Sequence, residues 1–218
     1  IEGHYSMDGD IPDLPRFIEI ARRHDAWLMV DEAHALGVVG TRGHGLHEHF
    51  VIDPNEVDIW MGTLSKTLSA CGGYIAGNAS LIEWLRHSAP GFVYSVGLAP
   101  ALAAAALESL AIMQVEPERV ARLQANAALF LGLAQEAGFD TGSASAHAII
   151  PVILGSSIAA GRYAQWLFER GINVQPIIYP AVAEKAARLR FFLSSAHSEA
   201  DIRTTITALM AIRKQAKG

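Results

Sequence analysis

The sequence predicts an α/β fold with a larger N-terminal part and a smaller C-terminal module of strands and helices. Short apolar runs with strand character alternate with helical segments along the 218 residues, which is the pattern of α/β proteins. Glycine-rich loops with ionisable residues follow the apolar runs in the first part of the chain. We place the boundary in the helical region around 105–125 and expect domains over 1–115 and 116–218.

The elements of the first part follow from local signals. Prolines and an acidic residue around Asp13 start a helix that continues to His24. An apolar strand is expected over 26–30, followed by a loop because four closely spaced glycines exclude a regular element. These glycines are Gly37, Gly40, Gly43 and Gly45. Further strands are expected over 57–61 and 73–77, and helices over 80–88 and 100–114.

The second part is expected to contain three helices and three strands. The first helix ends at Gly138, a residue type that commonly terminates helices, and the last begins with Ser198 as its N-cap. The expected helices cover 120–138, 161–171 and 198–214, and the expected strands cover 148–154, 172–178 and 189–193.

Composition excludes several classes of protein. The formal net charge of −5 argues against a nucleic-acid-binding protein, which normally carries a basic face. No apolar run reaches the roughly 18 residues of a membrane span. The single cysteine, Cys71, allows no internal disulfide and is typical of a reducing, cytoplasmic setting, so we expect a cytoplasmic protein. Because Ile1 starts the chain without a start methionine or a leader, we expect the C-terminal part of a longer protein.

The stretch from Gly62 to Thr67 carries the strongest chemical signal. Its hydroxyls, on Thr63, Ser65 and Thr67, can donate hydrogen bonds to a phosphate, and the amine of Lys66 can form a Schiff base with an aldehyde. A P-loop is excluded because Ser65, not glycine, precedes the lysine. A penicillin-binding S-x-x-K motif is excluded because position 63 is threonine. The alternative is an ordinary surface lysine.

A second group of polar residues, Asp31-Glu32-Ala33-His34, follows an apolar strand. The same letters occur in DEAH-box helicases, but the downstream chain is acidic and has no basic tract. The other interpretation places Asp31 beside a pyridine nitrogen, where a carboxylate keeps the nitrogen protonated and lets the ring accept electrons. His34 would then hydrogen-bond the phenolic oxygen of the same ring.

Other clusters have a functional and a plain interpretation. Arg188 and Arg190 share one face of an expected strand, either as surface charges or as ligands of a carboxylate. Ser95 is either a loop residue or a phosphate ligand, and Cys71 is interpreted as a packing residue. Three loop histidines resemble a metal site in spacing, but no cysteine or ordered carboxylate set accompanies them, and we expect no metal; they are His44, His47 and His49.

Four motifs occur here in the order found in α-oxoamine synthases: Ser6–Asp10, Asp31–His34, Gly62–Lys66 and Ala187–Arg190. On these motifs the chain resembles that family, a group of pyridoxal-phosphate enzymes with the fold-type I aminotransferase fold that includes 8-amino-7-oxononanoate synthase and serine palmitoyltransferase. The resemblance implies part of a large three-layer α/β/α domain, followed by a small C-terminal α+β domain. It also implies that the family's N-terminal portion is missing, so that this chain alone would bind the cofactor weakly or not at all.

The resemblance implies a role for each matching residue. Lys66 matches the lysine that binds pyridoxal 5′-phosphate covalently, Asp31 its pyridinium partner and His34 the ligand of its phenolic oxygen. Further cofactor contacts are implied for Ser6, Glu2, Thr63 and Ser65. Ser95 matches a hydroxyl that reaches the phosphate of a neighbouring subunit, which implies a homodimer with a shared active site. Arg190 matches the ligand of the amino-acid carboxylate, with Arg188 as the alternative.

The implied reaction condenses an amino acid with an acyl thioester, on coenzyme A or acyl carrier protein, and usually releases carbon dioxide. Such products serve biotin-type or sphingolipid-type biosynthesis. Two alternatives remain open: an aminotransferase of the same fold, and a non-catalytic fragment or subunit. The second is less favoured because silent family members tend to lack the lysine, and Lys66 is present.

Overall fold

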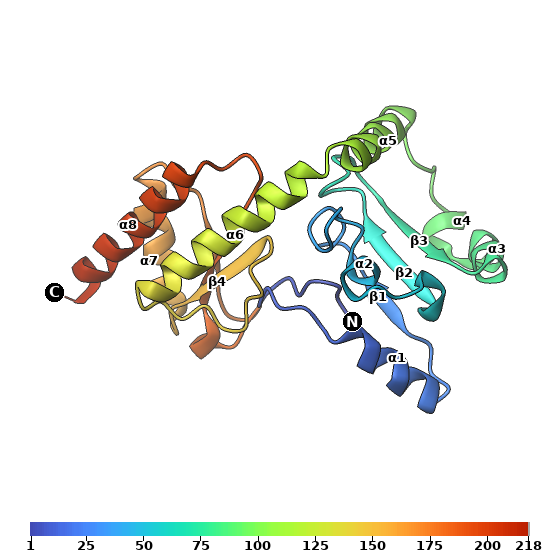
Figure 1. Ribbon diagram of the computed structural model, residues 1–218, viewed down its shortest axis with the longest axis horizontal. Helices are drawn as coiled ribbons and strands as arrows, with labels where there is room; N and C mark the ends of the chain where they lie inside the picture. Colours follow the sequence, from blue (N-terminus) through green and yellow to red (C-terminus); the bar gives the residue numbers. More distant parts are fainter. Residues whose placement is uncertain (218) are drawn as a thin grey trace. The chain divides into compact units, whose positions relative to one another are not determined.

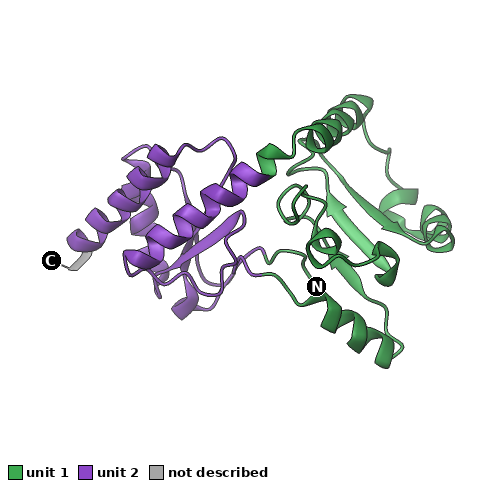
Figure 2. Ribbon diagram, viewed as in Figure 1, with its two compact units in different colours: residues 1–5, 11–120 green, residues 6–10, 121–218 purple. Residues whose placement is uncertain are grey.

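The computed structural model describes residues 1–217, and side chains as far as position 215. The chain divides into two compact units, coloured separately in Figure 2: unit 1 is Ile1–Tyr5 with Ile11–Val120, and unit 2 is Ser6–Asp10 with the chain from Ala121 onward. The division falls after Val120, and the short Ser6–Asp10 segment joins the second unit. Among the described helices, none is long and apolar enough to cross a membrane.

Unit 1 is built on a three-stranded mixed sheet (Figure 1). Strand β1 (Met29–Asp31) runs parallel to β2 (Ile59–Thr63), which runs antiparallel to β3 (Gly73–Gly77). The register pairs Asp31 with Met61 on one side of β2 and Gly73 with Thr63 on the other. The backbone amide of Asp31 also donates to Ile1, so the first residues lie along the free side of β1.

The helices of unit 1 are α1 (Leu14–Arg23), α2 (Leu46–Phe50), α3 (Ala79–Ser88), α4 (Pro90–Val93) and α5 (Pro100–Val115). A 3₁₀ turn, η1, covers Pro54–Glu56. The N-caps of α1 and α3 are the side chains of Asp13 and Asn78, which accept hydrogen bonds from backbone amides of the first turn. The core of this unit joins α1 to β1 and to the loop before α2 through the buried residues Leu14, Ile18, Val30, Val39 and Leu46.

Unit 2 contains an antiparallel sheet in the order β4 (Ile149–Ile153), β6 (Arg188–Phe192) and β5 (Gln175–Ile177). Its helices are α6 (Glu118–Glu136), which begins just before the division, α7 (Ser157–Phe168) and α8 (Glu199–Lys217). A 3₁₀ turn, η2, covers Glu184–Ala186. Helix α7 packs against α8, β5 and β6, and the rings of Phe130 in α6 and Phe191 in β6 lie 4.8 Å apart.

The α/β fold class is confirmed, and the strand expected over 73–77 has those bounds. The strand expected over 57–61 begins two positions later, at Ile59. The reason is that Val57 follows the 3₁₀ turn, while the carboxylate of Asp58 accepts a hydrogen bond from the backbone amide of Leu28. Helix α7 starts earlier than its expected range because Ser156 caps it, accepting from the backbone amide of Ala159. Helices α2 and α4 were not expected, since each is a single short turn.

Candidate functional site

The candidate site of unit 1 lies at the edge of the sheet where β1 and β2 end. Because these strands are parallel, their carboxyl ends meet at one edge, and Asp31 is the last residue of β1. The backbone amide of Glu32 donates to the carbonyl oxygen of Met61 at 2.7 Å, which extends the pairing by one step. Lys66 follows the last residue of β2, Thr63, in the next turn. The structure therefore brings the Asp31 and Lys66 segments to the same edge.

The Asp31 side chain is oriented by its own loop. One carboxylate oxygen, Oδ1, accepts a hydrogen bond from the backbone amide of Ala33 at 2.8 Å, and the side chain is partly buried. Glu2 forms an isolated parallel bridge with Asp31, and the amide of Gly3 donates to the carbonyl oxygen of Asp31. His34 is half-buried in the turn that follows. Three residues predicted for the site, Glu2, Asp31 and His34, thus lie on adjoining backbone.

The Lys66 turn is held by hydroxyl groups. The hydroxyls of Thr63 and Ser65 lie 2.8 Å apart, and Thr63 also contacts the carbonyl oxygen of Gly72 at 3.2 Å. The carbonyl oxygen of Lys66 accepts from the amide of Ser69 at 3.0 Å, and Lys66 itself is exposed. The two hydroxyls form one polar pair beside the glycine turn that leads into β3.

Thr67 does not join this pair. Its hydroxyl donates to the carbonyl oxygen of Leu36 at 2.8 Å, in the turn that follows His34. A threonine hydroxyl has a single proton to donate. In this structure the proton of Thr67 is therefore directed to Leu36, and its donation to a phosphate stays a prediction.

Glu32 is a buried acid that the sequence interpretation passed over. It is 5% exposed, its Oε1 accepts from the amide of Leu46 at 2.9 Å, and its Oε2 is buried without a hydrogen-bond partner in the described structure. Burial raises the pKa of Glu32 to about 7, a hydrogen bond from Leu46 opposes this rise, and the charge of Asp31 adds to it.

The pKa of Tyr74, in β3, is affected by burial and by the charges of Glu32 and Asp31. Its pKa is raised by burial and, to a smaller extent, by the negative charges of Glu32 and Asp31. Its ring covers Gly62, because a Cβ built at Gly62 would lie 2.4 Å from the tyrosine hydroxyl. A cavity of about 710 Å³ adjoins this part of the sheet, lined by residues that include Thr63, Gly72 and Tyr74 and extending to Arg86 and Phe92.

Ser95 lies on an exposed segment between α4 and α5. Its hydroxyl donates to the carbonyl oxygen of Phe92 at 3.2 Å and accepts from the amide of Gly97 at 3.3 Å. The structure does not bring Ser95 into hydrogen-bond contact with the Lys66 turn.

In unit 2 the structure joins Ser6 to Arg190. The Nη1 atom of Arg190 donates to the carbonyl oxygen of Ser6 at 2.9 Å, and its guanidinium lies 4.7 Å from the ring centre of Phe192. Arg188 is engaged differently: it is 5% exposed and its Nη1 contacts both the carboxylate of Asp8 at 2.5 Å and the carbonyl oxygen of Met7 at 2.9 Å. The neighbouring acid therefore neutralises Arg188.

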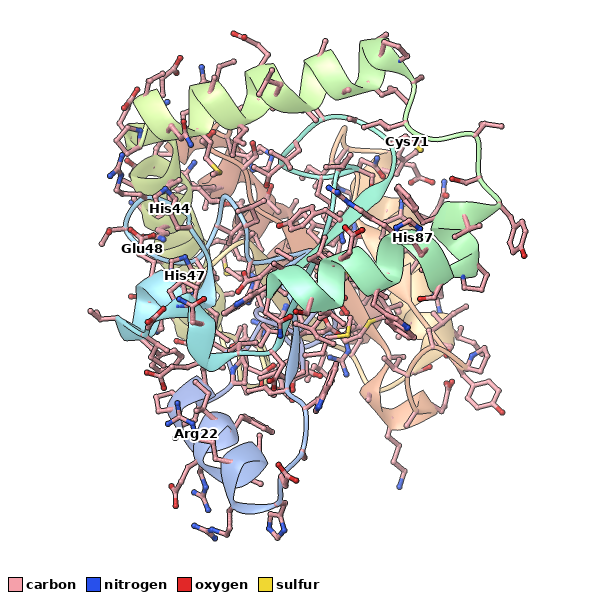
Figure 3. All side chains as sticks on the ribbon, turned by 90° about the vertical axis from the view of Figure 1, so that its right-hand side faces the viewer. Arg22, His44, His47, Glu48, Cys71 and His87 are labelled. Carbon is pink, nitrogen blue, oxygen red and sulfur yellow. The ribbon has the colours of Figure 1, made fainter. Side chains whose placement is uncertain are left out.

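Two of the three loop histidines, His44 and His47, lie near the carboxylate of Glu48, which already has hydrogen-bond partners. Figure 3 shows the side chains of His44, His47 and Glu48 gathered around this loop. The carboxylate of Glu48 accepts hydrogen bonds from the hydroxyl of Thr41 and from the backbone amides of Arg42 and His44. Within residues 1–217 no group of three or more His, Cys, Asp and Glu side chains is arranged to hold a metal ion.

The chain belongs to the aminotransferase class I and II family, whose model matches residues 1–209. It is 39% identical to 8-amino-7-oxononanoate synthase of Thermoanaerobacter pseudethanolicus over 214 residues, which are 98% of this chain and 54% of that protein. It is 38% identical to serine palmitoyltransferase of Bacteroides thetaiotaomicron over 210 residues, 96% of this chain and 53% of the relative. The chain thus spans about half the length of the curated relatives it matches.

Solved structures agree with these relatives. A serine palmitoyltransferase described with a PLP internal aldimine matches at a TM-score of 0.92 and 30% identity, over 98% of this chain and 54% of that one. The 8-amino-7-oxononanoate synthase of Francisella tularensis matches at a TM-score of 0.87 and 28% identity, over 100% of this chain and 63% of that one. The fold expected from the resemblance, that of the fold-type I aminotransferases, is confirmed.

Proposed function

We propose that this chain carries much of the active site of a pyridoxal-phosphate-dependent α-oxoamine synthase, which joins an amino acid to an acyl thioester. The observation that carries the proposal is the common sheet edge of Asp31 and the Lys66 turn, in a chain about 39% identical to such synthases. We further propose that unit 1 is the later part of the cofactor domain and that unit 2 is the small C-terminal domain.

The residues of the edge suit the chemical groups of this cofactor. Lys66 offers an exposed amine, and Thr63 with Ser65 offers paired hydroxyls beside the glycine turn. Gly72 has a φ of +125°, a backbone conformation that side chains rarely adopt, and its carbonyl oxygen accepts a hydrogen bond from the Thr63 hydroxyl at 3.2 Å. We propose that Lys66 and Asp31 hold the cofactor, together with His34, Thr63, Ser65, Ser6, Glu2 and Ser95.

Each residue then has a defined task. When bound, pyridoxal phosphate supplies an aldehyde that takes up an amino group and a ring that stabilises a carbanion. Asp31 would keep a proton on the pyridine nitrogen by its negative charge, and His34 would hydrogen-bond the phenolic oxygen of the ring. The amine of Lys66 would form the covalent attachment to this cofactor and, when free, would serve as the base for the proton of the amino-acid α-carbon.

Arg190 is proposed as the ligand of the amino-acid carboxylate. A guanidinium can bind a carboxylate through two parallel hydrogen bonds. Arg188 is less suited because the carboxylate of Asp8 already occupies it within 2.5 Å. Stacking of Arg190 on the ring of Phe192 would keep its guanidinium in a fixed plane.

A homodimer is proposed from the surface of unit 1. Helix α5 is apolar except for Glu108, Ser109 and Gln114, yet most of it is exposed, and helices this rich in apolar residues are normally buried. The segment before it is also exposed and apolar, with Tyr94 87% and Val96 106% accessible. Ser95 lies between these two residues, so a second copy covering this surface would receive its hydroxyl.

Thiol release from an acyl thioester tests the activity directly. The protein is supplied with pyridoxal phosphate, one amino acid at a time and a panel of acyl thioesters, and free thiol is followed. We expect amino-acid-dependent thiol release that is lost in Lys66→Ala and retained in Lys185→Ala. Amino-group exchange with a keto acid, without thiol release, would instead assign an aminotransferase. No reaction of either kind, with cofactor bound, would support a non-catalytic subunit.

A further inference from the structure

We propose that Thr67 is a positioning residue that locks the Lys66 turn onto the turn carrying His34. The inference rests on the proposed function and adds a residue to it. Thr67 follows Lys66 directly, and its acceptor, the carbonyl oxygen of Leu36, belongs to the turn that continues from Asp31 and His34. One side chain therefore joins the two segments that end at the shared sheet edge.

Both halves of the Thr67 side chain make contact. The hydroxyl donates to Leu36 at 2.8 Å in a partly buried position. The methyl group packs on the backbone of Gly37, since a Cβ built at Gly37 would lie 2.2 Å from Cγ2 of Thr67. Gly37 also has a φ of +78°, so both its conformation and this close approach require glycine.

The acceptor is held on both sides. The amide of Leu36 donates to the carbonyl oxygen of Glu32 at 3.0 Å, and the amide of Gly37 donates to that of Gly43 at 2.7 Å. A Cβ built at Gly43 would lie 2.9 Å from the Cα of Gly37, so the two glycine backbones are in close contact. Thr67 therefore binds a fixed point of the loop.

The backbone of the Lys66 turn is held in place as well. The amide of Ser69 donates to the carbonyl oxygen of Lys66, and Leu68 is buried at 6% exposure. With the backbone anchored on either side, the Thr67 contact determines where the Lys66 side chain leaves the chain relative to His34. Loss of the hydroxyl is expected to let the two turns move independently.

The test compares Thr67→Val, which keeps the shape but removes the donor, with Thr67→Ser, which keeps the donor. Thr207→Val is the matched control, because the Thr207 hydroxyl also donates to a backbone carbonyl, that of Arg203, at 2.9 Å on α8. Two readouts are used. One is the rate at which bound pyridoxal phosphate leaves the protein. The other needs no cofactor: the ¹³C resonance of Lys66 after reductive methylation, in a chain with only four lysines.

We expect Thr67→Val to speed cofactor release roughly fivefold, as loss of one partly buried hydrogen bond predicts, and to shift the Lys66 resonance. Thr67→Ser should restore both, and Thr207→Val should change neither. An unchanged Lys66 resonance in Thr67→Val would overturn the inference, as would failure of serine to restore it. If Thr67→Val does not fold, Thr67→Ser against Thr67→Ala gives the same comparison.

The two proposals fail in different ways. If the native protein, without substitution or methylation, binds no pyridoxal phosphate, the proposed function fails. The ¹³C resonance of Lys66 in the methylated protein still decides the role of Thr67. If the cofactor binds and Thr67→Val leaves both its release and the resonance unchanged, the proposed function stands and the inference about Thr67 is wrong.

Discussion

Glu32 is the residue at which burial and charge conflict most strongly in unit 1. Its carboxyl is 5% exposed and adjoins Asp31, and its pKa is raised to about 7, chiefly by burial. A proton on Glu32 removes a second negative charge from the sheet edge. Asp31 is the acid that we propose as the partner of the positively charged pyridine nitrogen.

This raised pKa predicts how stability depends on pH. In the unfolded chain Glu32 ionises near its ordinary value of 4.5, whereas in the folded protein it keeps its proton to about pH 7. Its contribution is therefore complete below pH 4.5 and is lost as the pH rises through 7, by roughly 3 kcal/mol. Urea unfolding at about pH 5 and about pH 8 should show this loss in the native protein and not in Glu32→Gln.

Glu48 provides the matched control for Glu32. Burial acts to raise its pKa, but hydrogen bonds from His44, Thr41 and Arg42 outweigh it and the pKa is lowered. Its contribution is present above the ordinary pKa and is lost only as the pH falls, so Glu48→Gln should leave the change between about pH 5 and about pH 8 intact. An identical pH response of the native protein and Glu32→Gln would refute the assignment of that response to Glu32.

Substituting the two arginines of β6 should have different effects, on stability at Arg188 and on substrate binding at Arg190. Arg188 is buried and tied to Asp8, Met7 and the carbonyl oxygen of Ala186, so Arg188→Ala should destabilise the protein by roughly 2–3 kcal/mol. Arg190→Ala should instead raise KM for the amino acid with a smaller loss of stability. Both are measured by urea unfolding and by steady-state kinetics.

A surface arginine supplies the control for these two. Arg203 pairs with Glu199 on α8, with 54% and 65% of the two side chains exposed, and such pairs contribute less than about 1 kcal/mol. Arg203→Ala should therefore change neither quantity appreciably. A stability loss for Arg190→Ala equal to that of Arg188→Ala would contradict the division of roles.

At the scale of elements, the glycine loop before α2 is shaped by close contacts as well as by backbone conformation. Gly45 precedes α2 with a φ of +92°, and a Cβ there would lie 2.3 Å from Oε2 of Glu32. The loop thus fits around the buried acid, and the same acid accepts the amide of Leu46 that opens the helix.

Gly45→Ala should therefore be strongly destabilising. Strain at positive φ adds to the clash with Glu32, and we expect a loss of roughly 2–4 kcal/mol in the free energy of unfolding. Gly161, inside α7, is the opposite case, because a Cβ added there would meet no atom of a neighbouring element within 4 Å. Gly161→Ala should stabilise by about 0.5–1 kcal/mol, because alanine is the better helix former. Equal effects of the two substitutions would contradict this account.

Most elements could be predicted from the sequence because their signals are local. Alternation of apolar runs located the strands, and Asp13 and Ser198 marked helix starts near their observed positions. Short helices such as α2 could not be predicted, since α2 depends on Glu32, which is distant in sequence and accepts the amide of its first residue. The bounds of β2 depend likewise on the contact of Asp58 with Leu28.

In the candidate site, too, some residues could be predicted from the sequence and others could not. Asp31 and Lys66 stand out by their residue types after apolar strands, and the parallel pairing of β1 and β2 follows from the α/β pattern. The partner of the Thr67 hydroxyl could not be read from the sequence, because it is a backbone carbonyl on another loop. The proposal of Arg190 over Arg188 also rests on the contact of Arg188 with Asp8, a residue far away in the chain, which the sequence does not show.

At the scale of the whole molecule, the proposed homodimer predicts the molecular mass of the protein in solution. Leu107 lies on α5 and is 69% exposed, so Leu107→Glu would place a charge in the interface. Sedimentation should show the native protein as a dimer and this variant shifted towards the monomer. Ile158→Glu is the control, since Ile158 is 74% exposed in unit 2. A native protein that sediments as a monomer would contradict the dimer.

Borohydride reduction followed by peptide mapping tests the central claim, that Lys66 is the attachment site of the cofactor. The chain has four lysines, so Lys185, Lys214 and Lys217 serve as internal controls. The protein is incubated with pyridoxal phosphate, reduced and digested, and the peptides are identified by mass. We predict a phosphopyridoxyl group on Lys66 alone, absent after substitution of Lys66 by alanine. A reduced adduct on another lysine, with Lys66 unmodified, would contradict the account.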